Sequence, residues 1–266
     1  MLGCSLVHVG MGNLGASARR AAVFSTGPVE VLATGQSNNW SGYDQGVLSV
    51  GHMFSQASAA WTVPTATQAV PGQAEDAATW VGIGGGCMNS SCSLTDPTTL
   101  IQAGTSEDVS SSGQVAYYAW YETLPEPEIP IAAMTVSAGD KVSVNILQHL
   151  PGQWYIFFRN FTNGAQAEIP IVYPSDMLTA EWIEESPLVI SSTSTTVAPL
   201  PKLTTVTFSA AMADGTLANL QANQAIDLVS ANGDVIAYPS APVSGSAFNV
   251  CVDPSGYLGA PTCPLP

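Results

Sequence analysis

The sequence predicts an all-β protein, and three observations lead to that fold class. The spacing of 3.6 residues that marks an amphipathic helix is scarce along the chain. Short runs of Thr, Val, Ser, Tyr and Trp are common instead, and Gly and Pro interrupt them. Hairpin-type turn sequences separate several of these runs. Many short strands at this spacing indicate a sandwich or a barrel, and one all-β domain can reach 266 residues.

The first 36 residues differ in composition from the rest of the chain. They are rich in Gly, Ala and Ser and contain the adjacent Arg19 and Arg20, so we interpret residues 1–36 as a prosegment or leader remnant. Residues 37–266 are expected to form a single domain with a C-terminal extension after about residue 240. The expected strands are 38–50, 53–63, 77–84, 99–105, 115–124, 132–137, 140–149, 153–161, 165–172, 178–184, 203–210, 225–230 and 234–238.

Turn chemistry supports several of these boundaries. Residues 192–202 read as a polar, Pro-containing loop. Four Gly-containing stretches are typical of tight hairpin turns, namely SAGDK (137–141), HLPGQW (149–154), FTNGAQ (161–166) and ANGDV (231–235).

The charge composition is low and one-sided. Only 9% of the residues are charged, with 20 Asp and Glu against 5 Lys and Arg. This balance argues against nucleic acid or an anionic membrane as a partner, because both require clustered bases. At about pH 2–3 most carboxylates are neutral, so a chain poor in bases avoids the self-repulsion that drives acid unfolding. We interpret the composition as acid adaptation; a merely acidic secreted protein is the alternative.

The cysteines predict an oxidising compartment. Cys87 and Cys92 would close a short loop, and Cys251 and Cys263 would tie down the C-terminal tail, as two local disulfides. Cys4 is left over and is assigned to the removed segment. No stretch of about 18 apolar residues predicts a transmembrane helix. A secreted, monomeric protein is expected.

Most common catalytic patterns are missing from the sequence. There are three histidines and no HExxH or GxSxG motif, so neither a zinc site nor a serine triad is indicated. GIGGGC (82–87) is Gly-rich but has no Lys for a phosphate loop. No cofactor is expected. Catalysis by carboxyl groups is the chemistry that these exclusions leave.

AEWIEESP (180–187) contains three glutamates. In a strand, Glu181 and Glu185 share one face and Glu184 lies on the other. Glu181 and Glu185 are roughly 13 Å apart along a strand, too far to share a proton. All three could equally be solvated residues of an edge strand. In TTLIQAGT (98–105), Gln102 is either a hydrogen-bonded core amide or a donor directed into a cleft.

Several segments, in the right order, resemble the glutamic peptidases, also called eqolisins or peptidase family G1. The resemblance covers residues 38 to about 210. The matching segments are NNWSGY (38–43), AAWTVP (59–64), ATWVGIGG (78–85), LIQAG (100–104), YYAWYE (117–122), VSAGDKVSV (136–144) and AEWIEE (180–185).

This resemblance implies a concanavalin-like β-sandwich of two large antiparallel sheets. It also implies a secreted acid endopeptidase made as a zymogen, acting on proteins or peptides without a metal and insensitive to pepstatin. By the family pattern, Gln102 and Glu185 are the catalytic pair. Substrate binding falls to four further residues, Trp40, Trp80, Tyr121 and Glu122.

Three positions depart from the fungal pattern. Gly84 and Tyr118 stand where fungal members have Asp, and Leu124 stands where they have Tyr. The departures suggest a bacterial or archaeal branch and leave specificity open.

In the expected mechanism Glu185 is the general base toward water, and the amide of Gln102 stabilises the oxyanion. Activity in acid then requires a Glu185 pKa at or below the usual ~4.3. Two other functions stay open: a lectin-like carbohydrate-binding or cell-surface module, and a glycosidase with two facing carboxyl groups.

Overall fold

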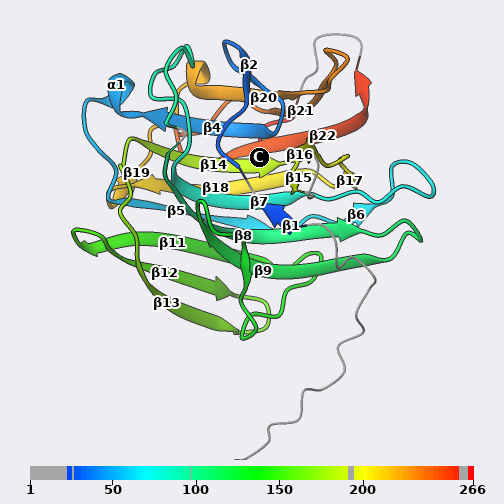
Figure 1. Cartoon of the computed structure of the whole chain (residues 1–266), viewed down its shortest axis with the longest axis horizontal. Coiled ribbons are helices and arrows are strands. Elements are labelled where there is room, and N and C mark those ends of the chain that lie inside the picture. The colour runs from blue at the N-terminus through cyan, green and yellow to red at the C-terminus, as the bar shows by residue number, and fades with distance from the viewer. Residues whose placement is uncertain (1–22, 26, 97, 191–194, 258–262) are drawn as a thin grey trace, which may run out of the picture.

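The computed structural model describes residues 23–25, 27–96, 98–190, 195–257 and 263–266. Nearly all regular structure is β, as predicted, in two large sheets that are antiparallel except for one parallel pair (Figure 1). Strand β20 (Ala225–Val229) pairs in both sheets and joins them at one edge.

The front sheet carries most of the motif segments, including those that contain Gln102 and Glu185. Its order is β10, β9, β8, β7, β14, β4 and β20. The bounds are Ile129–Pro130 for β10, Val115–Thr123 for β9, Leu100–Val109 for β8, Ala78–Gly84 for β7, Thr179–Glu185 for β14 and Trp40–Gly46 for β4.

The back sheet lies behind it, in the order β13, β12, β11, β5, β18, β22, β21, β20, β3 and β2, with β19 on β18. Only the β3–β20 pair is parallel among the pairings of this sheet. The bounds are Gln166–Val172 for β13, Gln153–Asn160 for β12, Lys141–Leu150 for β11, Gln56–Thr62 for β5, Val206–Ala213 for β18, Phe248–Tyr257 for β22 and Val235–Pro239 for β21. The short strands are Gln36–Ser37 for β3, Val31–Ala33 for β2 and Thr216–Leu217 for β19.

Short elements complete the described chain. A three-stranded sheet contains β1 (Val23–Ser25), β15 (Leu188–Ile190) and β16 (Thr195–Val197). Strand β6 (Ala66–Thr67) pairs with β17 (Lys202–Leu203). Helical turns are brief, α1 (Val47–Val50) and the 3₁₀ turn Ala222–Gln224. No helix among the described residues is long and apolar enough to cross a membrane.

Two apolar clusters define the two faces of the front sheet. The main core lies between the sheets and takes the inward residues of β7, β8 and β14, such as Val81, Ala103 and Trp182. The opposite residues of the same strands, including Trp80, Leu100 and Ile183, form a second cluster on the face turned away from the back sheet. We call these the inner face and the outer face.

Most predicted strands are confirmed, and the exceptions have local reasons. The expected strand at 132–137 is wrong, because the Met134 N–H turns back to the Ile131 carbonyl at 2.9 Å. The expected strand at 38–50 ends at Gly46, where α1 begins. Strand β22 was not predicted, yet it pairs with β18 and β21. The four predicted tight turns each contain a glycine with positive φ, at Gly139, Gly152, Gly164 and Gly233.

Both predicted disulfides are present. Cys87 bonds Cys92, and Cys251 bonds Cys263. Cys4, Arg19 and Arg20, which the prosegment hypothesis uses, lie outside the described residues.

Candidate active site

The strand that carries the three glutamates is central, not at an edge. Strand β14 pairs with β4 on one side and β7 on the other. Glu181, Glu184 and Glu185 have no exposed surface. The alternative of solvated edge residues is therefore wrong. The apolar Trp182 and Ile183 between the acids fix β14 inside the sheet, because each fills one of the two clusters.

Strand alternation separates the glutamates. Glu184 points to the inner face, where the Thr79 hydroxyl donates to its Oε2 at 2.6 Å. Glu181 and Glu185 point to the outer face with Ile183. Glu181 stands opposite Asp44 on β4, beneath a turn at Gly86 so tight that an added Cβ would lie 2.8 Å from Glu181 Oε1.

Glu185 is surrounded by N–H donors from three segments. Trp80 Nε1 donates to its Oε2 at 2.8 Å. Asn39 Nδ2 and the backbone N–H of Gly27 both donate to Oε1 at 3.3 Å. Donors of this kind favour the carboxylate form and fix its orientation. The arrangement suits a carboxyl group that accepts and donates a proton during catalysis.

Gln102 lies on the same outer face, held by an acid. Its Nε2 donates to Glu122 Oε2 at 2.8 Å, and the two residues are direct neighbours across β8 and β9. The strand register places Gln102 opposite Gly82 on β7, and Gly82 opposite Glu181 on β14. Glu181 is thus level with Gln102, while Glu185 lies four residues further along the strand. Glu122 accepts the hydrogen bond from Gln102, and its charge raises the pKa of Glu185.

Aromatic side chains line this face. The rings of Trp40 and Trp80 meet edge to face with centroids 4.9 Å apart, and Trp120 belongs to the same cluster. Tyr121 is not brought to the site. It follows Trp120 along β9, so it points to the inner face and packs against the main core. We therefore leave Tyr121 out of the candidate site.

The protonation state of Glu185 differs from the expectation. Burial raises the pKa of Glu185 well above its usual range. The Trp80 hydrogen bond lowers this pKa, and the neighbouring Glu122 carboxyl raises it. A Glu185 pKa at or below the usual value is therefore wrong for the closed arrangement described. The expected donors exist, but the loss of hydration outweighs them.

Two contributors to the site were not predicted. Asn39 bonds Glu185 and also segment 27–30, where its Nδ2 donates to the Pro28 carbonyl at 3.1 Å. Asn39 stands directly before Trp40 in the NNWSGY motif, and that adjacency is a signal available in the sequence. Gly27 had no such signal, because only the tertiary fold returns it to the site.

The three departures from the fungal pattern also have visible settings. Gly84 has a φ of 93°, which favours glycine. The Tyr118 hydroxyl donates to Glu128 Oε1 at 2.8 Å. Leu124 packs beside the outer-face cluster. Gln102 and Glu185 make the hydrogen bonds described above with all three of these residues in place.

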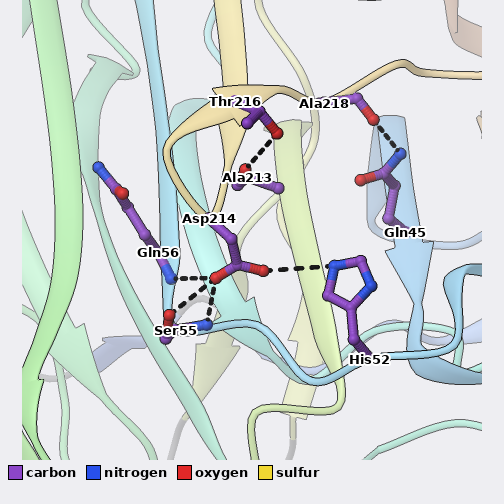
Figure 2. Close-up of polar contacts among 8 residues, drawn as sticks. All are labelled: Gln45, His52, Ser55, Gln56, Ala213, Asp214, Thr216 and Ala218. Carbon is purple, nitrogen blue, oxygen red and sulfur yellow. Dashed lines mark hydrogen bonds and ion pairs between the residues drawn. The ribbon is translucent and has the colours of Figure 1, made fainter.

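A histidine-based site is not supported. His52 Nε2 lies 3.4 Å from Asp214 Oδ2, and the Ser55 hydroxyl donates to Asp214 Oδ1 at 2.8 Å (Figure 2). In a catalytic triad the serine must bond the histidine, whereas here both bond the acid. The acid also accepts the backbone N–H groups of Ser55 and Gln56, so the cluster ties β5 to the β18–β19 turn. Among the described residues, no group of three or more His, Cys, Asp or Glu is arranged to hold a metal ion.

Comparison with known families decides the assignment. Residues 38–251 match the model of the Peptidase A4 family. The chain belongs to this family. As a Peptidase A4 member it is a glutamic endopeptidase, a hydrolase with protein or peptide substrates, and the lectin and glycosidase alternatives are set aside. No curated protein matches the chain.

Solved structures of Peptidase A4 relatives share the fold. Scytalido-glutamic peptidase, solved with a transition state analog inhibitor, has a TM-score of 0.63 at 22% identity, covering 81% of this chain and 98% of that chain. The eqolisin SCP-B, in a complex with the tripeptide Ala-Ile-His, gives 0.59 at 21%, with 81% and 98% covered. Aspergilloglutamic peptidase from Aspergillus niger gives 0.55 at 25%, with 67% and 99% covered.

Proposed function

We propose that the protein is an acid endopeptidase in which Glu185 and Gln102 act as a pair on a bound water. The observation that carries the proposal is the surroundings of Glu185. Trp80 and Asn39 donate to its carboxyl group, on the face that also carries Gln102 and Glu122. The third donor, Gly27, belongs to the segment that activation removes. Glu184 lies on the inner face, where the Thr79 hydroxyl donates to it instead.

Each step uses groups already on this face. Once water reaches Glu185, its pKa falls from the raised value of the closed arrangement. The ionised carboxylate then takes a proton from a water molecule, whose oxygen attacks the scissile carbonyl carbon directly. The amide of Gln102, oriented by Glu122, donates to the oxyanion. Protonated Glu185 then gives its proton to the leaving nitrogen as the C–N bond breaks, releasing an acid and an amine. An amide does not titrate in acid, so Gln102 keeps its donor where a histidine would be charged.

The remaining features of the proposal concern the setting of the enzyme. We infer secretion into an acidic environment as a monomeric zymogen that loses residues 1–36, with residues 37–266 forming one peptidase domain. The two disulfides support an oxidising compartment, and the net charge of −15 supports the absence of nucleic-acid and membrane partners. No cofactor is required by the mechanism.

The central test compares three isosteric substitutions on one strand. Glu185→Gln should lower casein hydrolysis at about pH 3 by roughly 10²–10⁴-fold, since it removes the general base. Glu184→Gln is the inner-face control. Glu181→Gln tests the outer-face acid that stands level with Gln102. The assignment is wrong if Glu185→Gln keeps more than roughly a tenth of the rate, or if Glu181→Gln loses as much.

Inhibitors test the class of mechanism. Activity should persist with pepstatin and with a chelator, because neither an aspartate dyad nor a metal takes part in the steps above. Loss of activity to the chelator, restored by added metal, contradicts the proposal.

A further inference from the structure

Glu185 cannot be reached by a substrate in the arrangement described. Glu185, Trp40 and Trp80 have no exposed surface. A working endopeptidase must admit an extended peptide here, so the segment now in contact with Glu185 has to leave. Residues 27–30, which we call the strap, make that contact, and β1 and the β2–β3 hairpin flank the strap.

The strap is held mainly through its backbone and bends at Pro28. The Gly27 N–H donates to Glu185, and the Val29 N–H donates to the Gly85 carbonyl at 2.9 Å. Asn39 bonds the strap twice, from Nδ2 to the Pro28 carbonyl and from the Glu30 N–H to Oδ1 at 2.9 Å. Backbone recognition of this kind fits any sequence, as a peptidase cleft requires.

The side chains of the strap alternate. Gly27 and Val29 are buried, Pro28 is half-buried and Glu30 is exposed. Val29 belongs to the outer-face cluster that contains Trp40, Trp80, Leu100 and Ile226. At Gly27 an added Cβ would lie 2.5 Å from Leu188 Cδ1, so only a small residue fits without movement.

We propose, resting on the function proposed above, that the strap is a built-in occupant of the substrate groove and that Val29 fills its main specificity pocket. In the proposed mechanism Glu185 gives its proton to the leaving nitrogen of the substrate. The Gly27 nitrogen is hydrogen-bonded to Glu185, so it occupies the position of that leaving nitrogen. The preferred substrate then has a small residue on the amine side of the cleaved bond. It has a medium-sized aliphatic residue, Val or Ile, two positions further toward the C-terminus.

The first test changes the strap in the full chain. Val29→Asn places an amide in an apolar pocket, which destabilises the closed arrangement. The ratio of open to closed protein should therefore rise by roughly tenfold or more. The initial rate of peptide hydrolysis in acid, without preincubation, should rise by a similar factor. Leu32→Asn, at a 49% exposed position on the neighbouring strand β2, is the matched control and should behave like the wild type. Val29→Ala gives a milder version should Val29→Asn fail to fold.

The second test does not need catalysis. The peptide acetyl-Gly-Pro-Val-Glu-Val-amide, which copies residues 27–31, should bind Val29→Asn protein and change the fluorescence of the outer-face tryptophans. The same peptide with Asn in place of Val should bind at least about tenfold more weakly.

The outcomes separate the two proposals. Equal binding of the two peptides, or a Val29→Asn rate no higher than that of Leu32→Asn, overturns the strap inference. If no variant hydrolyses any peptide, the proposed function fails. The comparison of the two peptides still tests whether Val29 fills a pocket of the groove.

Discussion

Glu184 and Glu185 are consecutive and chemically identical, and both are fully buried in β14. Glu185 on the outer face accepts hydrogen bonds from Trp80, Asn39 and Gly27. Glu184 on the inner face accepts one from Thr79, and its charge acts on Glu107. Burial of an acid therefore says little about its role. The face it occupies decides whether a substrate can ever reach it.

After Glu185 itself, the largest expected effect is on its partner. Gln102→Ala should lower kcat by about 10²–10³-fold with little change in KM, because the donor acts on the oxyanion. Gln102→Glu is the informative comparison, since a neutral carboxyl can still donate. Its activity should exceed that of Gln102→Ala in acid and vanish as pH rises. A kcat loss below about tenfold for Gln102→Ala removes Gln102 from the mechanism.

Indole groups on the two faces offer a matched pair. Trp80 Nε1 donates to Glu185, and Trp182 Nε1 donates to the Ser58 carbonyl at 2.9 Å. Each Trp→Phe change deletes one indole hydrogen bond. Trp80→Phe should cost about tenfold in kcat, typical of a bond to a charged group. Trp182→Phe should lower the melting temperature and leave kcat unchanged; equal kcat losses contradict the division into faces.

The inner-face acids predict a stability that fades toward neutral pH. Burial raises the pKa of Glu184 from 4.5 to about 8, against a lowering by the Thr79 hydroxyl. Burial and the charge of Glu184 raise the pKa of Glu107 well above 4.5. A raised folded-state pKa means the folded protein holds the proton more tightly. For Glu184 the stabilisation is complete below about pH 4.5 and is lost progressively up to about pH 8, at most about 1.4 kcal/mol per pH unit. Glu107 contributes a loss in the same direction as pH rises.

Glu184→Gln, a mimic of the neutral acid, should therefore flatten the fall in melting temperature between those pH values. Exposed Glu168→Gln is the control and should leave the curve unchanged. A wild-type protein that is more stable at pH 8 than at pH 4 contradicts this account of the acids and the acid-adaptation interpretation with it.

The smallest effect is expected at Tyr121. Because this side chain faces the main core, Tyr121→Phe should change kcat/KM by less than about twofold, in line with a substitution away from the site. Steady-state kinetics on a peptide substrate are sufficient to measure it. A larger loss would show that alternation along β9 does not assign function correctly.

Alternation and motif order were enough to predict much of this molecule. The separation of Glu184 from Glu185, the tight turns and both disulfides all rest on local patterns, and the structure has each of them. Strand β22 escaped prediction because its partners β18 and β21 lie elsewhere in the chain and FNVCVDPSGY has a proline within it.

The surroundings of the site were less predictable. The closed state of Glu185 depends on Gly27, which lies 158 residues away in sequence and arrives through tertiary structure alone. The raised pKa of Glu185 follows from that closure, so hydrogen-bond donors inferred from chemistry could not reveal its direction. The inner-face position of Tyr121 follows from the same alternation, because Glu122, the next residue along β9, pairs with Gln102 on the outer face. The family resemblance alone had assigned Tyr121 to substrate binding.

The burial of Asn39 has a practical consequence for producing the protein. Asn39-Trp40-Ser41 is an acceptor sequence for N-linked glycans, and so is Asn160-Phe161-Thr162. Both asparagines have no exposed surface, and both side chains are used in hydrogen bonds. A eukaryotic secretory host attaches glycans before folding is complete, and a sugar at either position cannot be packed into this fold. Bacterial expression should therefore give the active enzyme, while yeast should secrete only the fraction that escaped glycosylation at both sites.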